Sequence, residues 1–306
     1  MSRAPYRWRV NAVASTIAPG ARDAILAWYD TTGRELAFRA TADPYAVLVS
    51  ELMAQQTQAA RAADAWTSWM DRFPSVEALA SAPAADVLRA WAGLGYNRRA
   101  VHLHRAAKVI VAEHGGRVPS TVPALEALPG VGPYTARAVA AIAFGVPVGA
   151  VDVNVRRVLG RIAAGGPEAF TPAEMQALAD ASVPRGRAGA WTHALMDVGQ
   201  RVCKPARPNC ADCPAIAWCR YAAGERPGTV VAARTRRPEP AFESTNRWLR
   251  GRIVDLAREA PGWIPFGEPI GDHGEGAVRT AVLALARDGL LEVRETPTTL
   301  EARLPH

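Results

Sequence analysis

Four cysteines are the residues with the clearest chemical meaning in this sequence. Cys203, Cys210, Cys213 and Cys219 are the only cysteines of the chain and fall within seventeen residues, with gaps of six, two and five. Thiolates this close in the sequence can converge as the ligands of a metal site. Zinc ribbons use two tight pairs, whereas this chain has one, so the spacing favours an iron–sulfur cluster over structural zinc. Two disulfides are the remaining alternative, and they need an oxidising compartment.

A glycine-rich motif, LPGVGPYTA at residues 128–136, could bind a phosphate group. Gly130 and Gly132 flank Val131, and a helix is predicted to begin at about Pro133. Glycines can take positive φ and have no Cβ, so the backbone can approach an anion and present N–H groups at the helix N-terminus. The motif predicts a helix–hairpin–helix hairpin; a plain loop between helices is the alternative.

Helices must position both motifs, because almost no alternating strand pattern occurs before residue 290. Asp43 and Thr171, each followed by a proline, mark two helix starts. We predict an all-α fold with helices at residues 21–30, 44–55, 58–72, 84–92, 97–113, 134–144, 153–163, 172–182 and 187–202.

The last sixty residues show a different pattern. Helices are predicted at 245–259 and 275–289, followed by two strands, LLEVRE and LEARL, around a Pro-Thr-Thr turn. This pattern predicts a small α+β, winged-helix-like module. The predicted organisation is an N-terminal tail (1–20), a helical domain (21–223) that includes the cysteine loop (203–219), a linker (224–243) and the C-terminal module (244–306).

The charge of the chain favours a polyanionic partner. Its 306 residues carry a formal net charge of +7, although an arginine-rich composition is also typical of a GC-rich genome, so charge alone does not decide for nucleic acid. Residues 1–20 contain arginines but no apolar stretch, which argues against a signal peptide or a membrane anchor. We expect a cytoplasmic, nucleoid-associated monomer that does not contact a membrane.

Taken together, the motifs resemble the iron–sulfur DNA glycosylases of the endonuclease III (helix–hairpin–helix, HhH-GPD) superfamily. The resemblance is closest to the adenine glycosylases of the MutY type. It is carried by the cysteine spacing and by the segments PYAVLVSELMAQQTQ (44–58), WAGLGYNRRAVHLHRAA (91–107), LPGVGPYTARAVAAIAFG (128–145), AVDVNVRRVLGR (150–161) and ALMDVGQRVC (194–203). The resemblance implies a structural 4Fe–4S cluster on the four cysteines and double-stranded DNA with a mispaired or damaged base as the partner.

The resemblance also implies the chemistry of two carboxylates. Cleaving a deoxyribose–adenine bond requires protonation of the base and stabilisation of an oxocarbenium-like sugar. Glu51 matches the family's general acid, Asp152 the residue that stabilises the sugar cation, and Asn154 a neighbour that orients the site. The alternatives are a solvent-facing glutamate and a helix N-cap aspartate. The family commonly has glycine where Val153 stands.

Tyr134 occupies the position at which the bifunctional members of the superfamily carry a lysine. A lysine amine can form a Schiff base with the sugar, whereas a phenol cannot. The residue therefore predicts base removal without efficient strand cleavage. Read without the resemblance, Tyr134 is an ordinary core aromatic.

Extraction of a base from a duplex requires side chains that fill the gap. By resemblance, Gln55, Gln56 and Thr57 form one wedge segment, and Leu94 with Tyr96 forms an intercalation loop. The alternatives are a helix C-terminus at the glutamines and a turn aromatic that packs on Trp91. The nearby Arg98, Arg99 and Arg105 are predicted to contact phosphate or to be merely solvated.

The expected function is monofunctional removal, in base excision repair, of adenine mispaired with guanine or 8-oxoguanine. Residues 245–306 show no sign of the pyrophosphohydrolase-like domain that many adenine glycosylases add, so the opposite base is left open. One alternative is a uracil or thymine mismatch glycosylase on the same fold. A non-catalytic, DNA-binding iron–sulfur protein is another, and Glu51 together with Asp152 argues against it.

Overall fold

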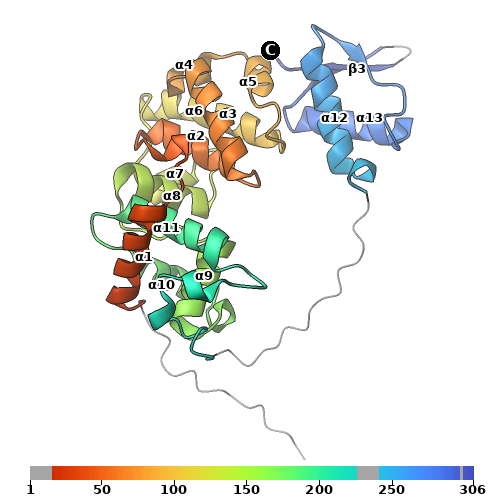
Figure 1. Ribbon diagram of the computed structural model, residues 1–306. Helices are drawn as coiled ribbons and strands as arrows, with labels where there is room; N and C mark the ends of the chain where they lie inside the picture. The colour runs from red at the N-terminus through yellow and green to blue at the C-terminus, as the bar shows by residue number, and fades with distance from the viewer. Residues whose placement is uncertain (1–15, 226–240, 297–298) are drawn as a thin grey trace, which may run out of the picture. The chain divides into compact units, whose positions relative to one another are not determined.

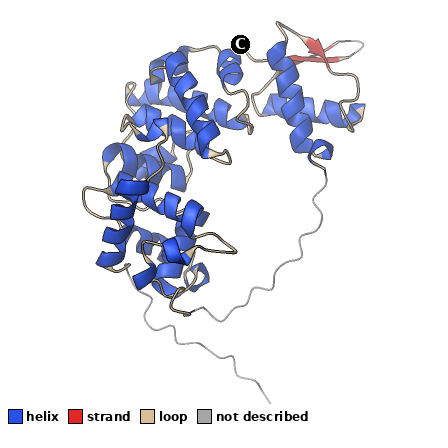
Figure 2. Cartoon of the chain, in the orientation of Figure 1, coloured by secondary structure: helices blue, strands red, loops and turns tan. Residues whose placement is uncertain are grey.

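The computed structural model describes residues 16–225, 241–296 and 299–306. Most of the predicted tail (1–20), most of the linker (224–243) and the turn at residues 297–298 lie outside these ranges. Within them the chain is mostly helical, with one small sheet near the C-terminus (Figure 2). Contacts divide the chain into two compact units, Met1–Glu35 with Pro133–Val230 and Leu36–Gly132 with Val231–His306. The predicted domain boundaries describe a different division and remain predictions.

The first unit is a helical bundle that ends in the cysteine loop. Its main helices are α1 (Pro19–Thr32), α8 (Pro133–Phe144), α9 (Val153–Ala164), α10 (Pro172–Ala181) and α11 (Ala188–Asp197). Helix α1 packs along α11 although most of the chain separates them (Figure 1). Ile25, Leu159 and Trp191 lie in the shared apolar core. A π-helical turn, η3 (Val198–Val202), follows α11 and leads into Cys203.

The second unit begins with six helices around an aromatic core. They are α2 (Pro44–Ala54), α3 (Ala59–Arg72), α4 (Val76–Ser81), α5 (Ala84–Ala90), α6 (Arg98–His114) and α7 (Val122–Glu126). The fully buried Trp69 and Trp91 meet edge to face with ring centroids 5.5 Å apart. Helix α2 is buried on almost every face, so it is the central element of this unit.

The same unit also contains the C-terminal module. Its elements are a short 3-10 turn, η6 (Phe242–Ser244), then α12 (Asn246–Glu259), β1 (Ile264–Pro265), α13 (Glu275–Arg287), β2 (Glu292–Glu295) and β3 (Leu300–Arg303). The antiparallel sheet has the order β1-β3-β2. This order of helix, strand, helix and hairpin agrees with the predicted winged-helix-like module.

The predicted helices are confirmed to within a few residues, and so is the fold class. The side chain of Asp43 accepts a hydrogen bond from the backbone of Ala46, and Thr171 forms a capping box with Glu174. The sequence pattern did not predict α4, α7 and β1, because these elements are too short to show a period. It also predicted one helix over 187–202, where α11 gives way to the π turn. None of the described helices is long and apolar enough to span a bilayer.

Candidate functional site

A buried arginine joins the two predicted DNA-binding loops of the second unit. The guanidinium of Arg99, on α6, donates to main-chain carbonyls at the end of α2 and in the loop before α6: Leu52 (2.8 Å), Met53 (3.0 Å), Gln55, Leu94 (2.9 Å) and Gly95 (3.0 Å). It also donates to Thr57 Oγ1 at 3.1 Å. Burial lowers the pKa of Arg99 to about 10, so the group remains a cation at neutral pH. One side chain therefore fixes two loops that are forty residues apart in the sequence.

Gln56 and Tyr96 lie at the tips of these two loops. Their φ angles of +55° and +46° are the only positive values of non-glycine residues in the described part of the chain. Such a backbone costs about 1–2 kcal/mol per residue and persists only where its surroundings fix it. Both side chains are exposed, Tyr96 by 42%. The structure thus brings the predicted wedge residues together around Arg99, on strained turns that present them to solvent.

The predicted phosphate contact by Arg99 is wrong, because this side chain is buried rather than solvated. It lies on the apolar stripe of α6 with Leu103, Ala106 and Ile110, at helical spacings of four, three and four residues. This period was the signal in the sequence that marked Arg99 as a core residue. The neighbouring Arg98 stays half-exposed, 3.7 Å from Asp288.

Glu51 lies on α2, one turn before Gln55. It is the only acidic residue of this helix, and its side chain is half-buried while Ser50 and Leu52 on either side are buried. The carboxyl group therefore lies at the boundary between the core of the second unit and solvent. A carboxyl group at such a boundary can reach a substrate while the surrounding core limits its contact with water.

The glycine motif requires glycine at one of its two positions. Gly130 has φ of +79°, and a Cβ there would lie 2.5 Å from the Cβ of His102 on α6. Gly132 has no positive φ and open space beside it. Val131 is buried between them and donates its N–H to the carbonyl of Leu128 at 3.1 Å. The expectation that both glycines use the left-handed region therefore holds only for Gly130.

Tyr134 lies in the first turn of α8, which begins at Pro133 as predicted. The side chain is half-buried. The position carries no amine, so Tyr134 cannot form a Schiff base with the sugar.

Asp152 is the N-cap of α9, in the first unit. Its Oδ1 accepts from the backbone N–H groups of Asn154 (2.8 Å) and Val155 (2.7 Å), and its Oδ2 accepts from the Asn154 amide at 2.7 Å. Val153, in place of the family's glycine, points to solvent and is 76% exposed. The N-cap role is therefore present, and three hydrogen bonds hold the carboxylate in one orientation.

Arg157 connects this carboxylate to the cysteine loop. Its Nη2 donates to Asn154 Oδ1 (2.9 Å) and to the carbonyl of Gly199 (2.7 Å), and its Nε donates to the carbonyl of Cys203 (2.7 Å). Gly199 lies in the π turn, and a Cβ there would come within 2.8 Å of the Cβ of Asn154. This role of Arg157 was not predicted, because nothing in the spacing of the residue in the sequence distinguishes it from a solvated arginine.

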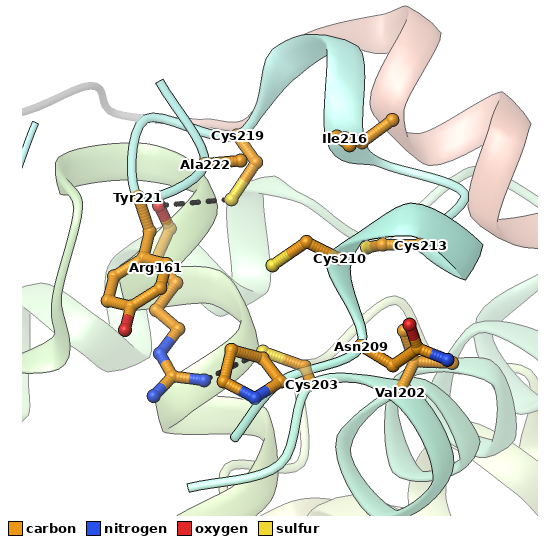
Figure 3. A pocket seen from close by; sticks show the side chains of 11 residues that line it. Arg161, Val202, Cys203, Asn209, Cys210, Cys213, Ile216, Cys219, Tyr221 and Ala222 are labelled. Carbon is orange, nitrogen blue, oxygen red and sulfur yellow. Dashed lines mark hydrogen bonds between the residues drawn. The ribbon is translucent and has the colours of Figure 1, made fainter. Parts of the chain in front are cut away.

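The four cysteines line one cavity at the end of the first unit (Figure 3). None of them forms a disulfide, and all four are half-buried, so the disulfide alternative does not describe this structure. Arg161, also missed from the sequence, stacks over the ring of Tyr221 (4.4 Å) and donates to Cys203 Sγ at 3.4 Å. Burial, with a smaller effect of the neighbouring thiols, raises the pKa of the Cys213 thiol to about 11. Thiols that face one cavity beside a cation are a suitable ligand set for a metal cluster.

Comparison with known proteins identifies the relatives of this chain. The profile of HhH-GPD superfamily base excision DNA repair proteins matches residues 49–184. The adenine DNA glycosylase of Mycobacterium tuberculosis is 43% identical over 241 residues, which are 77% of this chain and 78% of that protein. A thymine/uracil-DNA glycosylase of Methanothermobacter thermautotrophicus is 32% identical over 200 residues, 64% of this chain and 90% of its own length.

A solved structure supports membership of the same superfamily. The structure of a thermostable thymine-DNA glycosylase superposes with a TM-score of 0.63 at 30% identity, covering 66% of this chain and 95% of that one. The helical architecture, the ordered motifs and these relatives all indicate an HhH-GPD glycosylase. The chain belongs to the adenine DNA glycosylase family, within the HhH-GPD superfamily of base excision DNA repair proteins.

Proposed function

We propose that this protein is a monofunctional DNA glycosylase that hydrolyses the N-glycosidic bond of adenine mispaired with guanine or 8-oxoguanine. The observation that carries the proposal is the pair of exposed side chains, Gln56 and Tyr96, on strained turns that share Arg99. Base extraction needs rigid side chains that enter the stack, and a flexible loop would lose that rigidity. The choice of adenine rests on the higher identity to the adenine glycosylase, 43% against 32% for the thymine/uracil enzyme.

Glu51 is proposed as the general acid. A protonated carboxyl group would donate its proton to a ring nitrogen of the adenine, so that the electron pair of the breaking C1′–N bond leaves with a neutral base. Its half-buried position on α2, one turn before Gln55, favours this role, because it places the carboxyl group at the edge of the core, where a substrate can reach it. Water then adds to C1′ of the sugar cation, and the proton that this water loses returns the Glu51 carboxylate to its protonated form.

Asp152 is proposed to stabilise the positive charge that develops on the sugar. A carboxylate already oriented by three hydrogen bonds needs no reorganisation when that charge forms. Asn154 would keep Oδ2 in place through its amide, and Arg157 in turn holds Asn154.

Tyr134 supports hydrolysis without strand cleavage. Cleavage through a Schiff base needs a lysine amine at the sugar, and the phenol at this position offers none. We therefore propose that the product is an abasic site in an intact strand.

The cysteine loop is proposed to hold a 4Fe–4S cluster on Cys203, Cys210, Cys213 and Cys219. The residues fit such a group, since the four thiols face one cavity and Arg161 donates to a sulfur. No three ligating side chains in the described part of the chain already stand close enough to hold a single metal ion, whereas in a cluster each thiolate binds a different iron. When bound, the cluster supplies structural order to the loop.

The cluster assignment can be tested by metal analysis. The purified protein should contain iron and absorb visible light, and Cys210→Ser should lower the iron content and weaken DNA binding. Protein that contains zinc without iron and still releases adenine would contradict the assignment.

Double-stranded DNA is the proposed partner. Gln55, Gln56, Thr57, Leu94 and Tyr96 would contact the opened base step. The hairpin of Gly130, Val131 and Gly132 would lie against backbone phosphate, with the glycine N–H groups as donors, since the N–H of Val131 donates to Leu128. A monomer in the cytoplasm, associated with the nucleoid, remains our expectation.

The proposed function is tested by single-turnover base release. Four duplexes, with A opposite 8-oxoguanine, A opposite G, U opposite G and T opposite G, separate the rival activities. We expect release from the two adenine duplexes only. Release from the uracil or thymine duplex would favour the mismatch glycosylase alternative, and binding without any release would favour the non-catalytic alternative.

A further inference from the structure

The C-terminal module contributes to the surface that surrounds the predicted wedge residues. A groove within the second unit is lined by Gln56 and Tyr96 from the two loops and by Phe242, Arg247 and Trp248 from the module. The winged-helix-like module therefore contacts the loops that are proposed to open the base step.

The end of α12 holds the module on this surface through Arg258. This largely buried side chain donates through Nε to the carbonyl of Leu88 on α5 (3.0 Å) and through Nη2 to the Asn97 Oδ1 (2.8 Å). Its Nη1 donates to Asp255 on the same helix at 2.6 Å. Asn97 directly follows Tyr96, so the module is hydrogen-bonded to the wedge loop itself.

A second contact joins the module to the start of α6. Asp288, after α13, accepts a hydrogen bond from Arg250 of α12 at 2.5 Å and lies 3.7 Å from the guanidinium of Arg98. Two separate polar contacts therefore fix the orientation of α12 relative to the wedge loop.

Arg247, in the first turn of α12, stacks on the wedge tyrosine. Its guanidinium lies 4.3 Å from the centroid of the Tyr96 ring and 5.6 Å from that of Phe242. Arg99 lies 5.7 Å from the same tyrosine centroid. Within the described residues no carboxylate pairs with Arg247, so its contacts with the rings are what locate it. The Tyr96 ring is thus contacted by two guanidinium groups, of which only Arg247 comes from the module.

The start of α12 is held by further contacts within the module. The hydroxyl of Thr245 accepts a hydrogen bond from the backbone of Trp248 (3.2 Å), and the Trp248 ring stacks on His273 (5.8 Å between centroids). His273 Nε2 lies 3.0 Å from the carbonyl of Glu243. These contacts fix the turn that carries Phe242 and Arg247.

We propose that Arg247 is a positioning residue for the base-step wedge, acting through Tyr96. The cation–π contact holds the exposed ring in one orientation before DNA arrives, so the ordering of this side chain does not have to occur in the complex. The inference rests on the proposed function. It gives the C-terminal module a role in positioning Tyr96, which differs from a contact with backbone phosphate.

A double-mutant cycle on the full-length protein tests the proposal. Arg247→Ala should lower the single-turnover rate of adenine release by about tenfold. It should also reduce the rise in fluorescence of a 2-aminopurine placed beside the target adenine. This fluorescence reports unstacking of the bases. In a Tyr96→Ala background the same substitution should change neither readout. Effects that multiply in the double variant would overturn the proposal.

Two further variants separate positioning from charge. Arg247→Lys keeps the charge but loses the planar face that stacks on the ring, so it should restore only part of the 2-aminopurine signal lost in Arg247→Ala. Arg294→Ala removes the same charge from β2 of the same module, where Arg294 pairs with Glu301 at 2.6 Å, and should leave both readouts unchanged. Full activity of Arg247→Lys together with a shallower salt dependence of Arg247→Ala would identify Arg247 as a phosphate contact instead.

The binding readouts distinguish failure of this inference from failure of the proposed function. Anisotropy and 2-aminopurine fluorescence can be measured on a duplex with a tetrahydrofuran abasic analogue, which needs no base release. If the wild type releases no adenine, the proposed function fails, and the response of these signals to Arg247→Ala still supports or overturns the role of Arg247.

Discussion

The two compact units hold their candidate functional side chains by different means. In the second unit a single guanidinium, that of Arg99, binds two strained loops without any added group. In the first unit Asp152 is held through Asn154 and Arg157 to the backbone of Cys203, where a loop with four thiols begins. The Arg99 arrangement is complete in the polypeptide alone, whereas the Asp152 arrangement ends at a loop for which we propose a cluster.

The steps that we propose for the reaction are therefore assigned to different units. The unit that carries Glu51 also carries Gln56 and Tyr96, so the proposed proton donor and the proposed wedge residues share one core. The unit that carries Asp152 also carries the cysteine loop, so we expect the proposed stabilisation of the sugar cation to depend on the order of that loop. Variants of the two units should therefore lose different measured properties.

The largest effect is expected at Glu51. Glu51→Gln removes the proposed proton donor and keeps the shape of the side chain, so the single-turnover rate of adenine release should fall by about 10³-fold while DNA affinity stays near that of the wild type. Glu113→Gln, the same change at an exposed position of α6, is the matched control. A loss of less than tenfold, about 1.4 kcal/mol of barrier, would remove Glu51 from the mechanism.

A large loss of stability is expected at Arg99. Arg99→Met leaves buried carbonyls at Leu52 and Leu94 without their donor, so the free energy of unfolding should fall by about 3 kcal/mol. Lys108→Met removes a charge from an exposed position of the same helix and should change it little. Denaturant unfolding measures both, and equal stability of the two variants would show that Arg99 does not hold the loops.

A smaller loss of activity is expected for substitution of Arg157, and it should occur without a change in base-step opening. Arg157→Ala breaks the connection from Asn154 to Cys203, so the single-turnover rate should fall by about 10- to 100-fold, with iron content measured on the same preparation. The 2-aminopurine signal of base-step opening should be unchanged, since the wedge belongs to the other unit. Arg185→Ala, an exposed arginine of the same unit, controls for charge. A reduced unstacking signal in Arg157→Ala would contradict the idea that base-step opening depends only on the second unit.

The fold was largely predictable because its helices begin and end with strong local signals. Asp43 and Thr171 cap helices as predicted, and Gly93, Gly115 and Gly145 take the positive φ of helix stops. Helix α4 was missed because six residues do not complete two turns, and its N-cap, Ser75, resembles any loop serine.

The parts of the candidate site that depend on contacts between residues near in the sequence were predictable. The parts that depend on contacts between distant residues were not. The cysteines and the N-cap of Asp152 depend on neighbours within a few residues. The role of Arg99 depends on carbonyls at Leu52 and Leu94, which only the fold brings together. The positive φ of Gln56 and Tyr96 is likewise imposed by these contacts and is not a preference of either residue type.

The most direct test of the central claim follows one labelled strand through the reaction. A duplex with A opposite 8-oxoguanine is incubated with the wild-type protein, and the strand that carried the adenine is analysed before and after alkali and after borohydride treatment. We predict that adenine is released, that the strand stays intact until alkali breaks it, and that no covalent adduct is trapped, because Tyr134 offers no amine. Efficient borohydride trapping, or a strand that keeps its adenine, would contradict it.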